Sequence, residues 1–224
     1  MLRSMKGMIG YEVVSPEGVI GSVADFHVDR KNWALRYLVV KLDNIDRERK
    51  VFISPANLID KPDWGTRSFA LKISMKTAEK AAGALVESPV TREDEEKIHT
   101  FFGLDFYWAL EEPVKDGGHK TGKETGHNLS SLSGIMKYKI EASDGKCGRV
   151  MDLVLDDENW RMKYIAVSTD WFGGKKVLVP PQCIRSMELD KATMVLDITK
   201  EELKTSLKYD LHADVDRDVE GKRI

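Results

Sequence analysis

A cysteine and a group of carboxylates stand close together in the stretch DGKCGRVMDLVLDDENW, residues 144–160. Cys147 lies between two glycines, and its thiolate could act as a nucleophile or a metal ligand. Carboxylates are ligands for Ca²⁺, and five surround this cysteine: Asp144, Asp152, Asp156, Asp157 and Glu158. The stretch is therefore a reactive site, a metal site, or a turn followed by a strand.

An internal repeat supplies a control for these interpretations. Nine of the 23 positions in residues 18–40 are identical to the positions 127 residues later, without a gap. Self-similarity of this kind indicates two copies of one structural unit. The identical pairs are Gly18/Gly145, Gly21/Gly148, Val23/Val150, Asp25/Asp152, Asp29/Asp156, Asn32/Asn159, Trp33/Trp160, Tyr37/Tyr164 and Val40/Val167.

The repeat favours a structural role for the stretch around Cys147. The first copy has Ile20 at the position of Cys147, which indicates a buried apolar site, where a free cysteine behaves as a small hydrophobe. The first copy also has Arg30 and Lys31 where the second has two of its carboxylates, and DDENW lacks the ligand spacing of a calcium loop. We expect a solvated turn there.

Other chemical motifs in the chain are incomplete. GGHKTGKE, from Gly117, approaches the phosphate-binding loop, but Glu124 replaces the hydroxyl that would hold Mg²⁺. No histidine is paired with a cysteine or another histidine at zinc-site spacing; the five are His27, His99, His119, His127 and His212. We predict no catalytic set, no metal site and no cofactor.

Bulk properties indicate a cytoplasmic protein. The 224 residues include 35 basic and 37 acidic side chains, for a net charge of -2, so there is no signal for nucleic acid or an anionic membrane. No apolar run approaches the about 20 residues of a membrane helix, and the N-terminus lacks a signal-peptide core. Two cysteines in this setting are expected to be free thiols.

Each copy reads as short strands separated by turns, which is typical of a sandwich or small barrel. The alternation of apolar residues changes phase at Asp25 and at Asp152, as a β-bulge would cause. We expect both aspartates to bond backbone amides at these bulges. Counting the strand before the first turn, six strands per copy are predicted.

Helices and a linker separate the copies. Thr91 is predicted to cap a helix that Gly103 ends, and a second capped helix is expected from Thr199. The segment EEPVKDGGHKTGKETGHNLSS reads as a flexible linker. The domain boundaries are therefore predicted as a first barrel in 1–87, a helix with linker in 88–131, and a second barrel with a tail in 132–224.

These motifs together resemble the PRC-barrel family. The second copy has the DG-x-x-G turn, the following aspartate, the tryptophan before the central strand, and a hairpin ending in VLVPP. The resemblance implies a mainly β protein with two small PRC-type barrels in tandem, each followed by short helices. It assigns a structural signature to Gly18, Gly21, Asp25, Trp33, Gly145, Gly148, Asp152 and Trp160.

The resemblance implies a fold more than a reaction. Such barrels occur in the photosynthetic reaction centre H subunit and in the ribosome maturation factor RimM, where they serve assembly. We expect a non-enzymatic module for an unknown protein partner, with self-association as a further possibility. The alternatives are a ligand-binding or enzymatic groove between the barrels and an accessory role in RNA processing. Trp171 and Phe172 are expected either to contact a partner or to cover the barrel end.

Overall fold

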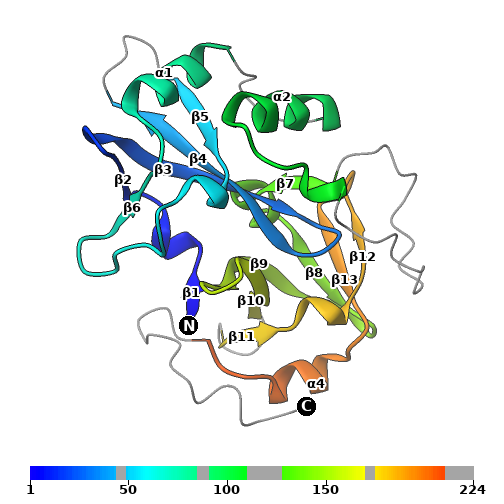
Figure 1. The fold of residues 1–224 in the computed structure, drawn as a ribbon. Helices are drawn as coiled ribbons and strands as arrows, with labels where there is room; N and C mark the ends of the chain where they lie inside the picture. Colours follow the sequence, from blue (N-terminus) through cyan, green and yellow to red (C-terminus); the bar gives the residue numbers. More distant parts are fainter. Residues whose placement is uncertain (44–48, 85–90, 110–127, 170–174, 210–224) are drawn as a thin grey trace.

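The architecture is seen in a computed structural model that describes residues 1–43, 49–84, 91–109, 128–169 and 175–209 (Figure 1). The described residues are mainly β, with short helices at two ends of the molecule. None of the helices in these ranges is long and apolar enough to cross a membrane.

The first repeat, residues 2–84, is a run of short strands closed by a helix. Its turns carry Gly18 and Pro55, residues suited to tight reversals. Its elements are β1 (Leu2–Ser4), η1 (Lys6–Met8), β2 (Glu12–Ser15), β3 (Gly18–Asp29), β4 (Ala34–Leu42), β5 (Lys50–Ile53), η2 (Pro55–Asn57), β6 (Ser68–Ala70) and α1 (Met75–Ala84).

The second repeat, residues 129–209, follows nearly the same order of elements, with β12 as an additional strand. Its first four strands have the bounds of β1 to β4 shifted by 127 residues. They are β7 (Leu129–Ser131), β8 (Lys139–Ala142), β9 (Gly145–Asp156) and β10 (Arg161–Thr169), followed by β11 (Lys175–Val179), η4 (Pro181–Cys183), β12 (Ile184–Glu188), β13 (Thr193–Leu196) and α4 (Lys200–Thr205); α3 (Leu132–Ile135) lies between β7 and β8.

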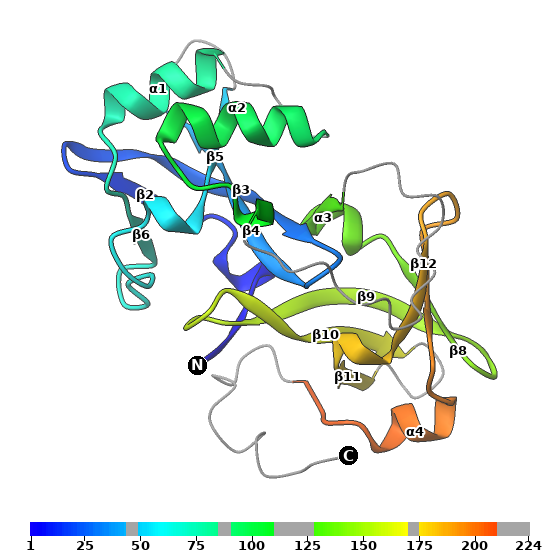
Figure 2. The ribbon, with the colours of Figure 1, turned by 45° about the vertical axis from the view of Figure 1, so that its right-hand side comes forward.

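Two further elements connect the repeats: α2 (Arg92–Phe102) and η3 (Tyr107–Ala109). Thr91 and Asp94 form the capping box that the sequence predicts, and Gly103 ends α2 in the left-handed conformation. Thr199 caps α4 in the same way. Figure 2 shows α1 and α2 over one end of the molecule and α4 at the opposite end.

The described strands do not form two separate closed barrels, so the expected tandem arrangement is not confirmed. The described strands make one sheet of 13, in the order β12-β13-β8-β9-β10-β4-β3-β2-β6, with β1, β5, β7 and β11 joined at its sides. In the described residues no pairing links β11 to β12, so the second repeat stays open. The two repeats share a sheet because β10 pairs with β4.

The repeats are related by an approximate two-fold axis through the pair Ala34 and Arg161. The amide of Leu35 donates to the carbonyl of Trp160 at 2.8 Å, and the amide of Met162 donates to the carbonyl of Trp33 at 2.7 Å. These two bonds are equivalent under the 127-residue shift. The axis therefore falls where the signature tryptophans introduce their central strands.

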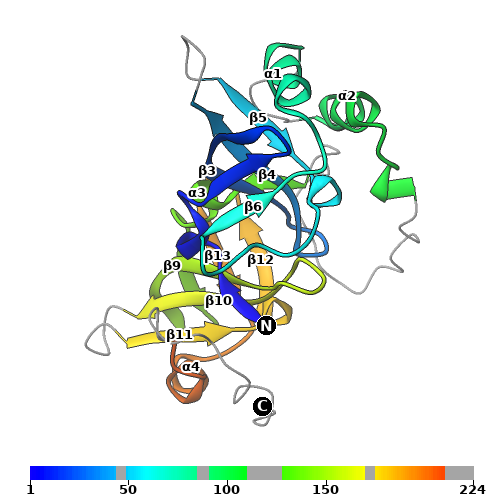
Figure 3. The ribbon, with the colours of Figure 1, turned by 60° about the vertical axis from the view of Figure 1, so that its left-hand side comes forward.

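The first strand of each repeat pairs with the other repeat. β1 is antiparallel to the end of β9, with Leu2 opposite Asp156, and β7 is antiparallel to the end of β3, with Leu129 opposite Asp29. Figure 3 shows β1 crossing from its own repeat towards β9 and β10. Residues 129–131 were expected in the linker because pairing with a distant strand leaves no local sequence signal.

One hydrophobic core runs through both repeats. Its largest fully buried side chains include Phe26 and Phe69 in the first repeat and Ile140 in the second. Trp33 and Trp160 pack against it with positive φ angles of 52° and 58°. Because the core crosses the shared strands, neither repeat encloses a core of its own.

Candidate functional site

The signature glycines lie where strands approach too closely for a side chain. A Cβ at Gly21 would lie 2.0 Å from the carbonyl oxygen of Lys41, and one at Gly148 would lie 1.9 Å from that of Ser168. Real Cβ atoms do not approach backbone oxygen so closely, so any substitution must push the hairpin open. The repeated glycines are therefore needed for the fold.

The signature aspartates lie at β-bulges, as the change of phase indicates. The strand register shifts between Val23 and Asp25, and it shifts again in the second repeat next to Asp152. Each carboxylate accepts a hydrogen bond from the next backbone amide, at 2.8 Å from Phe26 and 2.7 Å from Leu153. The expectation of amide bonding at these bulges is confirmed.

Both aspartates also bind the segment that arrives from the other repeat. Asp25 accepts from the amide of Ser133 at 3.2 Å and from its hydroxyl. Asp152 accepts from the amide of Lys6 at 2.9 Å and from the hydroxyl of Ser4. The bulge carboxylates thus hold the exchanged strands in place, a role that repeat alignment did not suggest.

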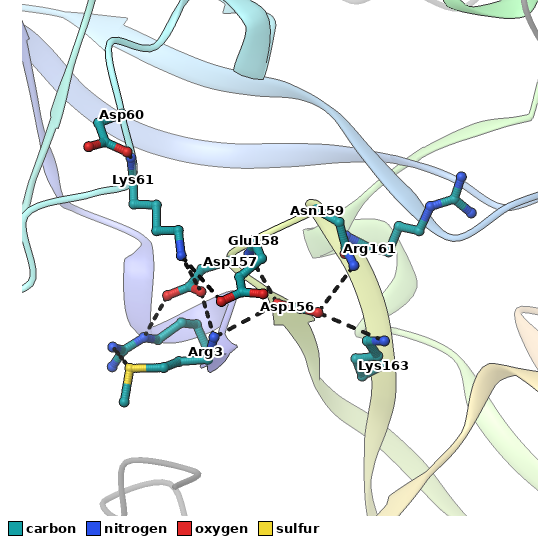
Figure 4. A network of polar contacts seen from close by, with 10 residues as sticks. Arg3, Asp60, Lys61, Asp156, Asp157, Glu158, Asn159, Arg161 and Lys163 are labelled. Atoms are coloured by element: carbon teal, nitrogen blue, oxygen red, sulfur yellow. Dashed lines mark hydrogen bonds and ion pairs between the residues drawn. The ribbon is translucent and has the colours of Figure 1, made fainter. Parts of the chain in front are cut away.

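The turn after β9 is only partly the solvated turn that the sequence suggests, because Glu158 and Asn159 are exposed but Asp157 is not (Figure 4). Asp157 is only 2% exposed, and three cationic groups surround its carboxylate: the amino group of Met1 at 2.6 Å, Arg3 at 3.4 Å and Lys61 at 3.6 Å. Burial raises the pKa of Asp157, but the amino group, Lys61 and Arg3 together outweigh it and lower the pKa. Asp156, Asp157 and Glu158 therefore bind residues of the first repeat through ion pairs.

Cys147 is a buried hydrophobic residue, as its alignment with Ile20 predicts. The side chain is 1% exposed and lies in the shared core. Burial raises the pKa of its thiol to about 11, so little thiolate exists near neutral pH. Cys147 and Cys183 are both free. Within the described ranges no group of three or more His, Cys, Asp or Glu is arranged to hold a metal ion.

The outer sheet face of the first repeat is covered by α2. Ile98 is fully buried there against Tyr37, Val39 and Phe52, and Phe102 packs beside it. This apolar contact positions a polar group that the motif search did not find. A capped helix with apolar residues was visible in the sequence, but the strand face that it covers was not.

Glu95 is the centre of this polar group. Its carboxyl is 1% exposed and lies 2.6 Å from the hydroxyl of Tyr107, 3.2 Å from that of Tyr37 and 3.0 Å from Arg92. Burial raises the pKa of Glu95, and the contacts with Tyr107, Arg92 and Tyr37 oppose that rise. His99 adds contacts to the hydroxyl of Tyr37 and the carbonyl of Asp105.

Aromatic rings surround this polar group on the side that faces solvent. The guanidinium of Arg36 lies 3.4 Å from the centre of the Tyr107 ring, and that of Arg92 lies 4.2 Å from the Trp108 ring. Phe106 stacks on Trp108 and is 39% exposed. Tyr107 thus packs against the first repeat, while Phe106 remains accessible to solvent.

The outer face of the second repeat is covered by an extended segment after α4. Tyr209 packs against Val154, Ala166 and Leu178, and its hydroxyl donates to Asp152 at 2.7 Å. The amide of Leu178 donates to the carbonyl of Leu207 at 2.8 Å, so this segment lies along β11. Asp152 is therefore completely buried, while Asp25 remains partly exposed.

The remaining predicted residues divide between described and undescribed parts of the chain. His27 and His99 are buried, in the first repeat and α2 respectively. Trp171 and Phe172, the expected contact residues, lie outside the described residues, as do His119, His127 and His212.

Comparison with known proteins supports part of the expected relationship. A model of the PRC-barrel domain family matches residues 140–203, from β8 into α4. The second repeat carries a PRC-barrel domain. This match does not include the first repeat, although its strands follow the same order. No curated protein matches the chain.

Proposed function

We propose that this chain is a non-enzymatic binding and assembly module that holds a protein partner by pairing with one of the partner's extended segments. A PRC-barrel domain is a general β module, so the mode of binding has to be inferred from the sheet itself. Addition of a strand to a sheet edge is a common way to bind peptides, with backbone bonds giving affinity.

The observation that supports this proposal is that β1 and β7 each pair with a strand of the other repeat. Each is three residues long, and each is bound by backbone pairing to a strand of the other repeat. A third extended segment, around Lys208, pairs with β11. The same fold therefore captures a short extended segment at three places within one chain.

β12 offers an edge for a fourth such segment. It is the terminal strand of the sheet path, and in the described residues it is hydrogen-bonded on one side only, to β13. Four of its five residues are partly or fully exposed. An unpaired edge of this kind is a template for another strand.

Proline substitutions in β12 test the proposal. Successive residues of a strand direct their amides to opposite sides, so Ser186→Pro and Met187→Pro each remove one amide from a different side. Partners are first identified by pull-down of the full chain with mass spectrometry. The variant that removes the amide facing away from β13 should keep the wild-type unfolding midpoint and lose the partner. If that variant retains the partner, β12 is excluded as the binding edge.

A matched test concerns the loop between β10 and β11. If the aromatic residues there contact the partner, the double substitution of Trp171 and Phe172 by alanine should reduce capture without changing the midpoint. Light scattering of the same proteins reports whether the partner is a second copy of the chain.

A further inference from the structure

Three side chains connect α2 to the centre of the sheet in a continuous line. Nδ1 of His99 lies 2.7 Å from the carbonyl oxygen of Asp105, and Nε2 lies 3.1 Å from the hydroxyl of Tyr37. That hydroxyl lies 3.2 Å from Oε2 of Glu95. Glu95 and His99 are 1% and 4% exposed, so bulk solvent does not reach these contacts.

The contacts among Glu95, Tyr37 and His99 need more hydrogen-bond donors than these side chains have when Glu95 is ionised and His99 is neutral. A carbonyl oxygen only accepts, so Nδ1 of His99 must carry a hydrogen and Nε2 of the neutral ring is an acceptor. An ionised Glu95 is also only an acceptor. The hydroxyl of Tyr37 has one hydrogen and faces two acceptors, Nε2 of His99 and the carboxylate of Glu95. One of these two contacts therefore has lone pairs on both atoms and no hydrogen between them.

We propose that this line binds one additional proton, carried on Glu95, and that the proton fastens α2 to β4. The carboxyl of Glu95 then donates to the oxygen of Tyr37, and Tyr37 donates to Nε2 of His99. Every contact in the line has its own hydrogen. Unpaired acceptors in a buried site are costly, so binding of the proton and docking of the helix are linked.

Charged and titratable groups face these three side chains from four elements. α2 contributes Arg92, β4 contributes Arg36, η3 contributes Tyr107, and β3 contributes Asp29, which pairs with Arg36 at 3.0 Å. Arg92 favours an ionised Glu95, but burial is the largest influence and raises the pKa of Glu95. Burial also lowers the pKa of His99, which keeps the ring neutral.

The second repeat provides a buried carboxyl without this shortage. Asp152 accepts from two amides, of Lys6 and Leu153, and from two hydroxyls, of Ser4 and Tyr209. Each of these four donors brings its own hydrogen. Burial raises the pKa of Asp152 as it raises that of Glu95, so Asp152 serves as an internal control that shares burial with Glu95 and differs in having a donor for every contact.

Infrared and nuclear magnetic resonance spectra of the full chain test the position of the proton. At mildly acidic pH, above the ordinary Glu pKa of about 4.3, we expect a carboxylic-acid stretching band that Glu95→Gln removes and Asp152→Asn does not. The ¹⁵N shift of His99 should show Nε2 without a hydrogen. An ionised Glu95 at this pH, whatever the state of His99, would overturn the proposal.

Unfolding in urea tests the link to stability. A raised pKa in the folded state stabilises fully below the ordinary pKa of Glu, and the stabilisation is lost as pH rises through the folded pKa. The wild-type midpoint should therefore fall with rising pH relative to that of Glu95→Gln, which does not titrate at this position. Tyr37→Phe removes the bridging hydroxyl and should change the size of this difference, while the part that comes from burial of Glu95 remains. Parallel midpoint curves for wild type and Glu95→Gln would contradict the proposal.

Discussion

The two repeats have the same outer sheet face and cover it with different elements. Helix α2 covers the face around Tyr37 through Ile98 and a polar group centred on Glu95. An extended segment covers the equivalent face around Tyr164 through Leu207 and Tyr209. The face thus requires burial, but its geometry does not determine what buries it.

The two covering elements, α2 and the extended segment after α4, differ in whether the buried carboxyl belongs to them or to the strand beneath. In the second repeat the carboxyl belongs to the strand, at Asp152, and the cover brings the hydroxyl of Tyr209. In the first repeat the carboxyl belongs to the cover, at Glu95, and the strand brings the hydroxyl of Tyr37. The equivalent aspartate, Asp25, is left partly exposed. We therefore expect equivalent positions in the two repeats to contribute unequally to the free energy of unfolding.

The largest expected effect separates these two aspartates. Asp152→Ala leaves several buried donors without an acceptor and should lower the free energy of unfolding by about 3–5 kcal/mol. Asp25→Ala should cost only about 1–2 kcal/mol, because water can reach the donors. Chemical denaturation of both variants measures the difference, and equal losses would contradict the comparison of the repeats.

The second largest difference is expected in the stability lost when an apolar side chain of each covering element is truncated. Ile98→Ala removes a fully buried side chain and should cost about 2–4 kcal/mol. Leu207→Ala removes a partly buried one and should cost about 1 kcal/mol. Thermal unfolding compares them under the same conditions. A larger loss at Leu207 would mean that the extended segment is the stronger cover.

The turns after β3 and β9 should differ in their dependence on pH. Asp157 has a lowered pKa, so its stabilisation is present above the ordinary pKa of about 3.9 and is lost as pH falls through the folded value. Asp157→Asn should cost about 1–2 kcal/mol at neutral pH and progressively less in acid. Arg30→Ala, at the equivalent first-repeat position, should show no such pH dependence in urea titrations.

The smallest expected effects concern the helix caps. Thr91→Ala and Thr199→Ala each remove a capping box and should each cost about 1 kcal/mol. Circular dichroism and chemical denaturation would measure the loss. Equal values would show that α2 and α4 gain the same local stability from their caps, so that the two repeats differ in the contacts made with the sheet.

Local features of this fold were readable from the sequence. Asp25 and Asp152 lie at bulges because the bulge changes the phase of the apolar alternation, which sequence displays directly. Thr91 and Gly103 bound α2 because capping involves residues within one turn. Cys147 could be assigned to the core because its aligned residue is Ile20.

Features that depend on distant contacts were not readable. β1 and β7 pair with the opposite repeat. A three-residue strand is too short to show a sequence pattern from which its partner strand could be identified. The burial of Asp157 depends on Arg3 and Lys61, which are far from it in sequence. The polar group around Glu95 joins residues of α2, η3 and β4, so no single motif contains it.

The pairing of Leu2 with Asp156 has a consequence for synthesis of the chain. The ribosome must add more than 150 residues after Leu2 before its partner strand exists. At 5–20 residues per second this takes roughly 8–30 s. During this time β1 has no strand to pair with, and for most of it the first repeat also lacks β7. Formation of this strand pair is therefore a late step in folding of the chain during synthesis.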